Sequence, residues 1–165
     1  MASKRDTLNL AILEAAPHVR RFAFSLCRNA AEADDLVQST IERVLSRQVP
    51  EEADMKRWMF QVCRNLWIDG LRARTVRTSA SGEIERQVAE PISAEVEAGD
   101  RIMLARTEAA INALPDAYRE VLTLVAVGGS SYKEASDLLD VPMGTVMSRL
   151  ARARAMLADA TGYAA

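Results

Sequence analysis

The sequence predicts an all-α protein made of two small helical domains joined by a flexible linker. Of the 165 residues, 49% are hydrophobic but only 5% are aromatic, and the abundant Ala, Leu, Arg and Glu favour helices over strands. Apolar residues recur at helical spacing along most of the chain. That spacing fails over residues 75–99, where Ser, Gly and Pro punctuate an acidic stretch, as is typical of a linker.

The first domain, residues 7–74, is expected to hold three helices. In the first helix, Phe22 and Leu26 lie on one apolar stripe. Asn29 is the predicted N-cap of the second helix, and Glu32, three residues later, is its capping partner. This second helix keeps its apolar period to about residue 47.

The third predicted helix begins at a capping residue, Asp54, and continues to about Arg74. It is apolar on more than one side, which is typical of the central helix of a bundle. One side carries Met59, Val62, Cys63 and Leu66, and another carries Phe60, Trp67 and Leu71. Trp58 and Trp67 could also stack on nucleic-acid bases, but their helical spacing favours the core.

The second domain, residues 100–159, is expected to hold four short helices. The first covers about residues 100–113, and the second starts with Pro115 in its first turn and ends at the Gly128–Gly129 pair. The two remaining helices are separated by only a short connection in the sequence.

A capping box formed by Ser131 and Glu134 starts the third helix of this domain. Only residues 140–142 separate it from the fourth, which runs to about Ala158, and two helices joined by so short a turn form a helix-turn-helix. The fourth helix must bury the face formed by Val146, Leu150, Ala153 and Leu157. The opposite face, where a recognition helix places its base-reading side chains, carries Met147, Ser148, Ala151 and Arg152.

Charge is segregated along the chain. Residues 54–77 carry six basic residues against two acids, and residues 30–52 carry six acids against two arginines. The last helix adds three arginines and has no acid before Asp159. Basic surfaces suit phosphate backbones, whereas the acidic segment suits a basic protein partner. For any single cluster, a solvated face is the alternative interpretation.

Several functional classes find no support in the sequence. No apolar run approaches the length of a membrane span, and the first residues do not resemble a signal peptide, so we expect a cytoplasmic protein without membrane insertion. Cys27 and Cys63 are expected to be buried thiols rather than a disulfide. With His18 as its one histidine and no Cys-x-x-Cys, the chain is not expected to bind a metal. No catalytic constellation can be assembled, so we expect no enzyme.

Three segments carry a family resemblance. Residues 33–38, with the sequence ADDLVQ, resemble the polymerase-binding helix of sigma-70-type factors. Residues 58–72 resemble the helix that meets the minus-10 promoter element, and residues 114–154, which include GTVMSRL, resemble the minus-35-reading domain. With two sigma domains and no extra region between them, the chain is similar to the extracytoplasmic-function group, and within it to the general-stress members.

This resemblance implies a sigma-2-like bundle that binds core RNA polymerase and the minus-10 element, followed by a sigma-4-like helix-turn-helix that binds minus-35 promoter DNA. The implied polymerase-binding residues are Asp34, Asp35, Leu36, Val37 and Gln38. The implied minus-10 residues are Lys56, Arg57, Arg64, Asn65, Asp69, Arg72 and Arg74. The implied minus-35 residues are Thr145, Met147, Ser148, Arg149, Ala151, Arg152 and Arg154. It also implies an anti-sigma factor as partner, no cofactor, and a monomer when free.

Some alternatives stay open at this point. Asn65 and Asp69 could line a base pocket or only bond the backbone locally. Met147 departs from the family, whose members often have Lys or Arg there, and this removes one possible phosphate or guanine contact. A sigma-like decoy that titrates an anti-sigma factor would not need Arg149 and Arg152. A helix-turn-helix repressor is the other alternative, but that function would not explain the acidic helix.

Overall fold

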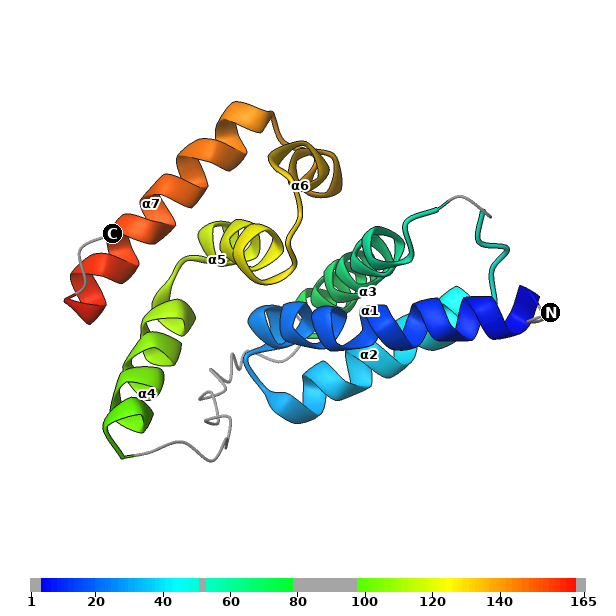
Figure 1. Cartoon of the computed structure of the whole chain (residues 1–165), viewed down its shortest axis with the longest axis horizontal. Coiled ribbons are helices and arrows are strands. Elements are labelled where there is room, and N and C mark those ends of the chain that lie inside the picture. Colours follow the sequence, from blue (N-terminus) through cyan, green and yellow to red (C-terminus); the bar gives the residue numbers. More distant parts are fainter. Residues whose placement is uncertain (1–3, 51–52, 79–97, 163–165) are drawn as a thin grey trace. The chain divides into compact units, whose positions relative to one another are not determined.

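The computed structural model of the chain describes residues 4–50, 53–78 and 98–162. These residues form helices joined by short turns, with no strand among them, and they divide into two compact units (Figure 1). The first unit contains α1 (Lys4–Cys27), α2 (Ala30–Leu45) and α3 (Met55–Thr78). The second contains α4 (Ala98–Ala113), α5 (Asp116–Leu122), the π-helix η1 (Thr123–Val127), α6 (Tyr132–Leu139) and α7 (Met143–Thr161). The predicted all-α fold with two helical units is confirmed.

Most of the predicted linker, residues 79–97, lies outside the described residues. Its two ends belong to helices, because residues 75–78 extend α3 and residues 98–99 begin α4. In the α3 extension, the Thr75 hydroxyl donates a hydrogen bond to the carbonyl of Leu71 at 3.0 Å.

Local capping determines where the helices of the first unit begin. The Asn29 side chain accepts a hydrogen bond from the Glu32 backbone N–H at 3.0 Å, which confirms Asn29 as the N-cap of α2. Between α1 and α2, Arg28 adopts the left-handed conformation with φ 57°, so the chain reverses within two residues. Asp54 Oδ1 accepts from the Arg57 N–H at 3.2 Å and caps α3 as predicted.

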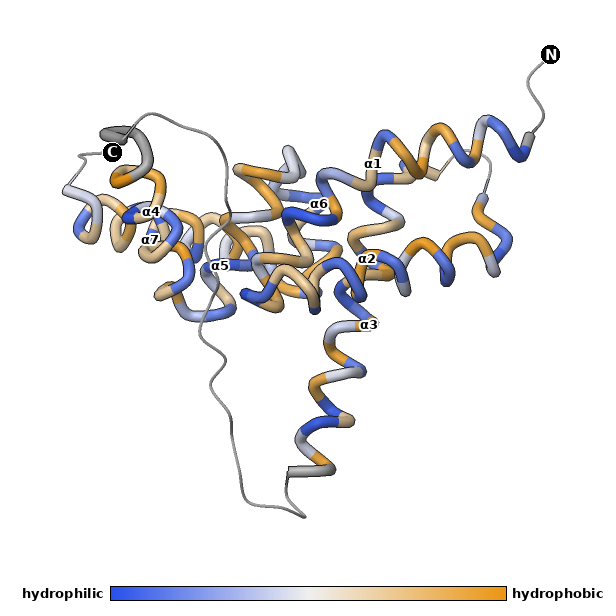
Figure 2. The backbone as a smooth tube through the Cα atoms, turned by 90° about the horizontal axis from the view of Figure 1, so that it is seen from below, coloured by the Kyte–Doolittle hydropathy of each residue, from blue (hydrophilic) through white to orange (hydrophobic). Residues whose placement is uncertain are grey.

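The core of the first unit is formed by one face of each of its three helices, which pack pairwise against one another. Figure 2 shows apolar residues recurring between hydrophilic ones along these helices. Phe22 of α1 and Phe60 of α3 meet edge to face, with ring centroids 5.2 Å apart, at the centre of this core. The expectation that Leu71 belongs to a buried face is wrong: its side chain is 41% exposed. Residues 71–76 are all exposed, because the helical period of α3 continues past the packed part of the bundle.

In the second unit, α7 packs against α4, α5 and α6. Its predicted buried stripe is confirmed for Val146, Leu150 and Ala153, whereas Leu157 is only half-buried. Ser131 and Glu134 form the predicted reciprocal capping box at the start of α6, with bonds of 2.7 and 3.2 Å.

The turn of the helix-turn-helix is a left-handed residue followed by a proline. Asp140 has φ 53° and ends α6, and the Ser136 hydroxyl donates to the carbonyl of Val141 at 2.6 Å. Pro142 then provides the fixed φ that suits the start of α7.

One part of the second unit differs from the expected regular helix. The helix predicted to run from Pro115 to the Gly128–Gly129 pair is α-helical only to Leu122 and continues as η1. At the end of η1 the N–H of the capping residue Gly128 donates to the carbonyl of Thr123, five residues earlier, at 2.8 Å. Gly129 then takes φ 67°, which favours glycine, and ends this segment.

Candidate nucleic-acid and protein interfaces

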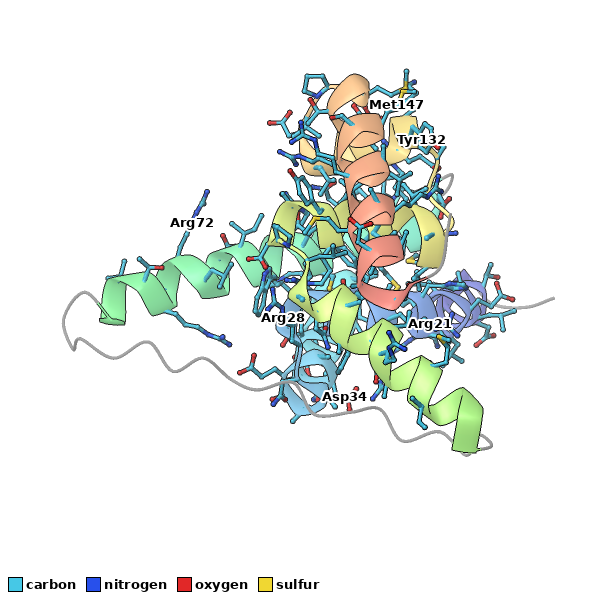
Figure 3. The ribbon with its side chains drawn as sticks, turned by 90° about the vertical axis from the view of Figure 1, so that its left-hand side faces the viewer. Arg21, Arg28, Asp34, Arg72, Tyr132 and Met147 are labelled. Carbon is cyan, nitrogen blue, oxygen red and sulfur yellow. The ribbon has the colours of Figure 1, made fainter. Side chains whose placement is uncertain are left out.

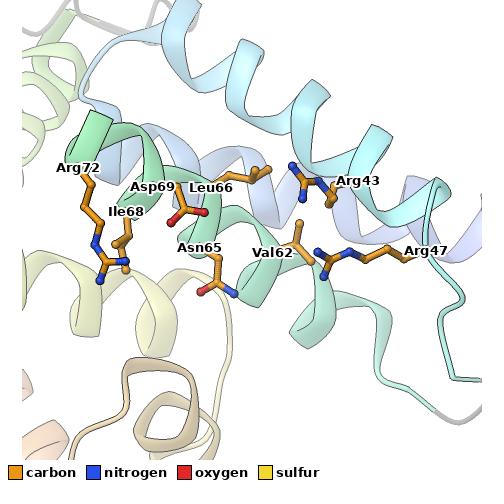
Figure 4. Close-up of a pocket in the computed structure, with 8 residues that line it drawn as sticks. All are labelled: Arg43, Arg47, Val62, Asn65, Leu66, Ile68, Asp69 and Arg72. Atoms are coloured by element: carbon orange, nitrogen blue, oxygen red, sulfur yellow. The ribbon is translucent and has the colours of Figure 1, made fainter. Parts of the chain in front are cut away.

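A polar pocket of about 360 Å³ lies between the end of α2 and the middle of α3. Its lining residues are Arg43, Arg47, Val62, Asn65, Leu66, Ile68, Asp69 and Arg72 (Figure 4). Three of the predicted minus-10 residues, Asn65, Asp69 and Arg72, are thus brought together on one side of α3. An amide and a carboxylate can pair with base edges, and the guanidinium groups around them can hold phosphates.

Arg43 and Arg47 were not predicted as part of this site. They were counted only as minor charges within an acidic segment. Arg43 lies in the last turn of α2 and Arg47 lies just beyond its end. Two arginines within five residues of an otherwise acidic segment are the sequence signal that could have found them. They approach the pocket from the end of α2, opposite the α3 side chains (Figure 4).

The other predicted minus-10 residues do not line this pocket. Lys56 and Arg57 lie in the first turn of α3, and Arg64 is half-buried. Arg74 lies 5.5 Å from the centre of the Trp67 ring, and its Nη2 is 3.5 Å from Glu32 Oε2. Arg74 therefore contacts the ring of Trp67 and the carboxylate of Glu32 on α2. The predicted minus-10 residues of α3 thus fall into two groups, those that line the pocket and those that lie elsewhere on the helix.

The residues of the predicted acidic interface on α2 also differ in their surroundings. Asp34 forms a two-pronged ion pair with Arg20 of α1, with Nε–Oδ1 at 2.7 Å and Nη2–Oδ2 at 3.3 Å. This hydrogen bond, and then the charge of Asp34, raise the pKa of Arg20 above its ordinary value. Gln38 donates to Glu42 at 3.2 Å along the same helix. Figure 3 shows Asp34 at the surface of the first unit.

Asp35 has a different environment from Asp34. It is exposed and lines a small pocket of about 200 Å³, together with Leu36, Trp67 and Arg74. Leu36 and Val37 are half-buried, so each offers some surface to a partner. An exposed carboxylate beside partly exposed apolar groups is the arrangement expected of a protein-binding helix.

The recognition helix α7 exposes most of its predicted minus-35 residues. Met147, Ser148, Ala151, Arg152 and Arg154 are exposed, and Thr145 and Arg149 are half-buried. The Arg152 Nη1 lies 3.4 Å from the hydroxyl of Tyr118 on α5. The Ser148 hydroxyl donates to the carbonyl of Thr145 at 3.1 Å, so its oxygen can still accept a hydrogen bond. Tyr118 was not predicted as part of this surface, and it contacts Arg152, the arginine that was expected to read a base.

Both cysteines are free thiols, as expected, but only Cys63 is buried, whereas Cys27 is half-buried. Both thiols are protonated at neutral pH. Burial, and then the charge of Glu32, raise the pKa of Cys27 to about 12. Burial raises the pKa of Cys63 to about 12 as well, although a hydrogen bond with Thr40 lowers it in part. An unfolded thiol ionises near pH 8.5. The raised pKa values therefore contribute fully to the free energy of unfolding below pH 8.5, and this contribution is lost as the pH rises toward 12.

We predict that neither thiol is alkylated readily in the folded protein. At pH 8, a thiol with a pKa of about 12 has a thiolate fraction roughly 1000-fold below that of an ordinary cysteine. Iodoacetamide labelling followed by mass spectrometry measures this, and the same reaction in urea is the control, in which both thiols react quickly. Labelling of the folded protein at the urea rate would contradict the prediction.

Within the part of the chain that the structure describes, no helix is both long and apolar enough to cross a membrane. Nor do those residues include a group of three or more His, Cys, Asp or Glu side chains that could hold a metal ion.

Comparison with known proteins identifies both units. The family model for sigma-70 region 2 matches residues 12–77, and the model for sigma-70 region 4 matches residues 104–157. The sigma factor EcfG of Rhodopseudomonas palustris is 33% identical over 154 residues, which cover 92% of this chain and 83% of EcfG. SigM of Bacillus subtilis is 31% identical over 144 residues, covering 84% and 85%. Both are named ECF RNA polymerase sigma factors.

A solved structure agrees with these relatives. The sigma factor RpoE of Bartonella quintana, crystallised in complex with the anti-sigma factor NepR, has a TM-score of 0.80 and 27% sequence identity, covering 93% of this chain and 96% of the other. Two family models in the expected order, with relatives that align over most of both chains, show that the chain belongs to the sigma-70 family, within its extracytoplasmic-function group of RNA polymerase sigma factors.

Proposed function

We propose that this chain binds core RNA polymerase and directs it to promoters, with the first unit at the minus-10 element and the second at the minus-35 element. The observation that carries the proposal is that each unit holds its own DNA-suited surface, the arginine-lined pocket between α2 and α3 and the arginine-bearing helix α7. This role requires no catalytic group. The free protein is proposed to be a monomer that acts in the cytoplasm, where its polymerase is found.

The pocket between α2 and α3 supports capture of a single base at minus-10. Opening a duplex costs a few kcal/mol for each base taken out of the stack, and a pocket that receives the extruded base offsets that cost. Asn65 and Asp69, which line this pocket, are proposed to pair with a base edge, and Arg43, Arg47 and Arg72, which line it as well, to contact the DNA backbone. This also favours the base-pocket interpretation of Asn65 and Asp69 over a purely local one.

The helix-turn-helix supports sequence reading at minus-35. Of the four residues predicted to face the bases, Met147, Ser148, Ala151 and Arg152, only Arg152 can form a forked pair of bonds with guanine. Its guanidinium also lies 3.4 Å from the Tyr118 hydroxyl of α5. Arg149, which is half-buried at the flank of the helix, is proposed to contact phosphate.

The test is in vitro transcription by core polymerase with this chain, on promoters that differ by single minus-35 bases and across salt concentrations. Arg152→Ala is expected to cost about 1–3 kcal/mol on the preferred sequence and to relax preference at one or two base pairs. Arg149→Ala is expected to weaken all promoters alike and to reduce the salt dependence. If Arg152→Ala lowers every promoter equally, Arg152 is a phosphate contact. A wild-type chain that initiates nowhere would overturn the proposed function and favour a decoy or a repressor.

We further propose that an anti-sigma factor restrains this chain. The support is that the similar RpoE of Bartonella quintana was solved with the anti-sigma factor NepR. Affinity purification of the tagged chain from unstressed cells, with mass spectrometry, should recover a small protein partner. Recovery of only the free chain or the polymerase complex would contradict this part of the proposal.

A further inference from the structure

The N-terminal half of α7 exposes a row of apolar side chains that its packing does not explain. Met143 and Met147 are each 50% exposed, and Ala151 is exposed as well. Successive positions four residues apart form one ridge along a helix, so Met143, Met147 and Ala151 make a continuous apolar ridge. Figure 3 shows Met147 projecting outward from α7. The buried stripe of Val146, Leu150 and Ala153 lies on a different face of the helix.

The charges around this ridge indicate what it meets. Arg149, Arg152 and Arg154 are the charged residues of α7 before Asp159. Arg152 directly follows Ala151 and Arg154 continues the line of the ridge one turn later, so positive charge adjoins the ridge and no acid of α7 lies near it. An apolar protein groove would not need these arginines, whereas two phosphate backbones flank every base pair of a DNA major groove. The charge pattern therefore favours DNA as the occupant.

The chemistry of the ridge then selects the base. In the major groove, thymine presents a C5 methyl group, which is the apolar feature that distinguishes it from cytosine. Methionine side chains are long and unbranched, so they adapt their shape to such a group. Resting on the proposed minus-35 role, we infer that the Met143–Met147–Ala151 ridge is a specificity element that reads thymine methyl groups in the minus-35 segment. It acts beside Arg152, which reads guanine.

The test isolates the methyl group. Holoenzyme made from core polymerase and this chain first selects a promoter from a library with a randomised minus-35 segment. Each thymine of that segment is then replaced singly by deoxyuridine, which keeps base pairing and removes only the methyl. One or two of these replacements are expected to reduce open-complex formation about three- to fivefold, which corresponds to the loss of one buried methyl.

Two variants assign the effect to the ridge. With Met147→Ala, the same uracil replacements should have no further effect, because the contact is already gone. With the control Met156→Ala, which removes another exposed methionine of α7 outside the ridge, the uracil penalty should remain. Met147→Leu, which keeps an apolar contact of similar size, should also keep it.

The outcomes separate this inference from the proposed function. If wild-type holoenzyme initiates normally but is indifferent to every uracil, the inference is overturned and the promoter role stands. If Met147→Ala also weakens capture of core polymerase, the ridge is a protein contact instead. If no sequence is selected and no initiation occurs, the proposed function itself fails.

Discussion

Replacing Asp35 with Lys is expected to weaken binding to core RNA polymerase about 10- to 100-fold while leaving the fold intact. The residue is exposed on α2 beside the half-buried Leu36 and Val37. In the proposed complex, its carboxylate faces a basic helix of the polymerase, so a lysine at this position replaces attraction by repulsion. Because the side chain contributes nothing to the packed core, the helical content should not change.

Binding of fluorescently labelled chain to core polymerase, followed at several salt concentrations, measures this effect. Glu14→Lys is the matched control: it makes the same change in net charge at an exposed position of α1 and should bind normally. Asp34→Lys is a poorer probe, because it would also break the ion pair with Arg20. A folded Asp35→Lys protein with unchanged affinity would remove α2 from the docking surface.

Arg119→Ala is expected to destabilise the second unit by about 2–4 kcal/mol. Arg119 is 2% exposed, and its Nη1 donates to the carbonyl of Leu114 at 2.7 Å. Truncation leaves that carbonyl without this donor and opens a cavity where the side chain lay. The ion pair with Asp116, at 2.5 Å, contributes little because the Asp116 side chain is 80% exposed.

Two spectroscopic signals can be compared in one urea titration. Both tryptophans, Trp58 and Trp67, belong to the first unit, so their fluorescence follows that unit, while far-UV circular dichroism follows both. Arg119→Ala should move the circular dichroism transition to lower urea and leave the fluorescence transition in place. Asp116→Asn, which removes the ion pair and keeps the bond to Leu114, should cost less than about 1 kcal/mol. Equal destabilisation by the two variants would show that the ion pair, and not the buried carbonyl bond, matters.

Local sequence patterns were enough to predict most of the helices, several of their starts and most of their buried faces, but not the exposure of Leu71 or the π-helix η1. Asn29, Asp54 and the Ser131–Glu134 capping box predicted three helix starts, because capping joins residues only three positions apart. The buried stripe of α7 follows from a period of 3.6 residues, which is equally local. The family was also evident from sequence, because each of its motifs lies within a single helix or a helix-turn-helix.

Which distant side chains meet depends on how the helices pack against one another. The sequence placed Arg43 and Arg47 in an acidic helix, but the packing of α2 on α3 brings them to Asn65 and Asp69. The same packing brings Arg74 to Glu32 of α2, whereas the contact of Arg74 with Trp67 lies within α3.

Two further pairings depend on packing in the same way. Arg20 meets Asp34 across α1 and α2, and Tyr118 meets Arg152 across α5 and α7. Helical periodicity specifies which face of a helix is apolar, but not which residue of a neighbouring helix lies opposite each polar side chain. The residue that lies opposite depends on how helices that are far apart in sequence cross and align. The same crossing therefore determines which charged side chains form ion pairs within the protein and which remain exposed to a partner.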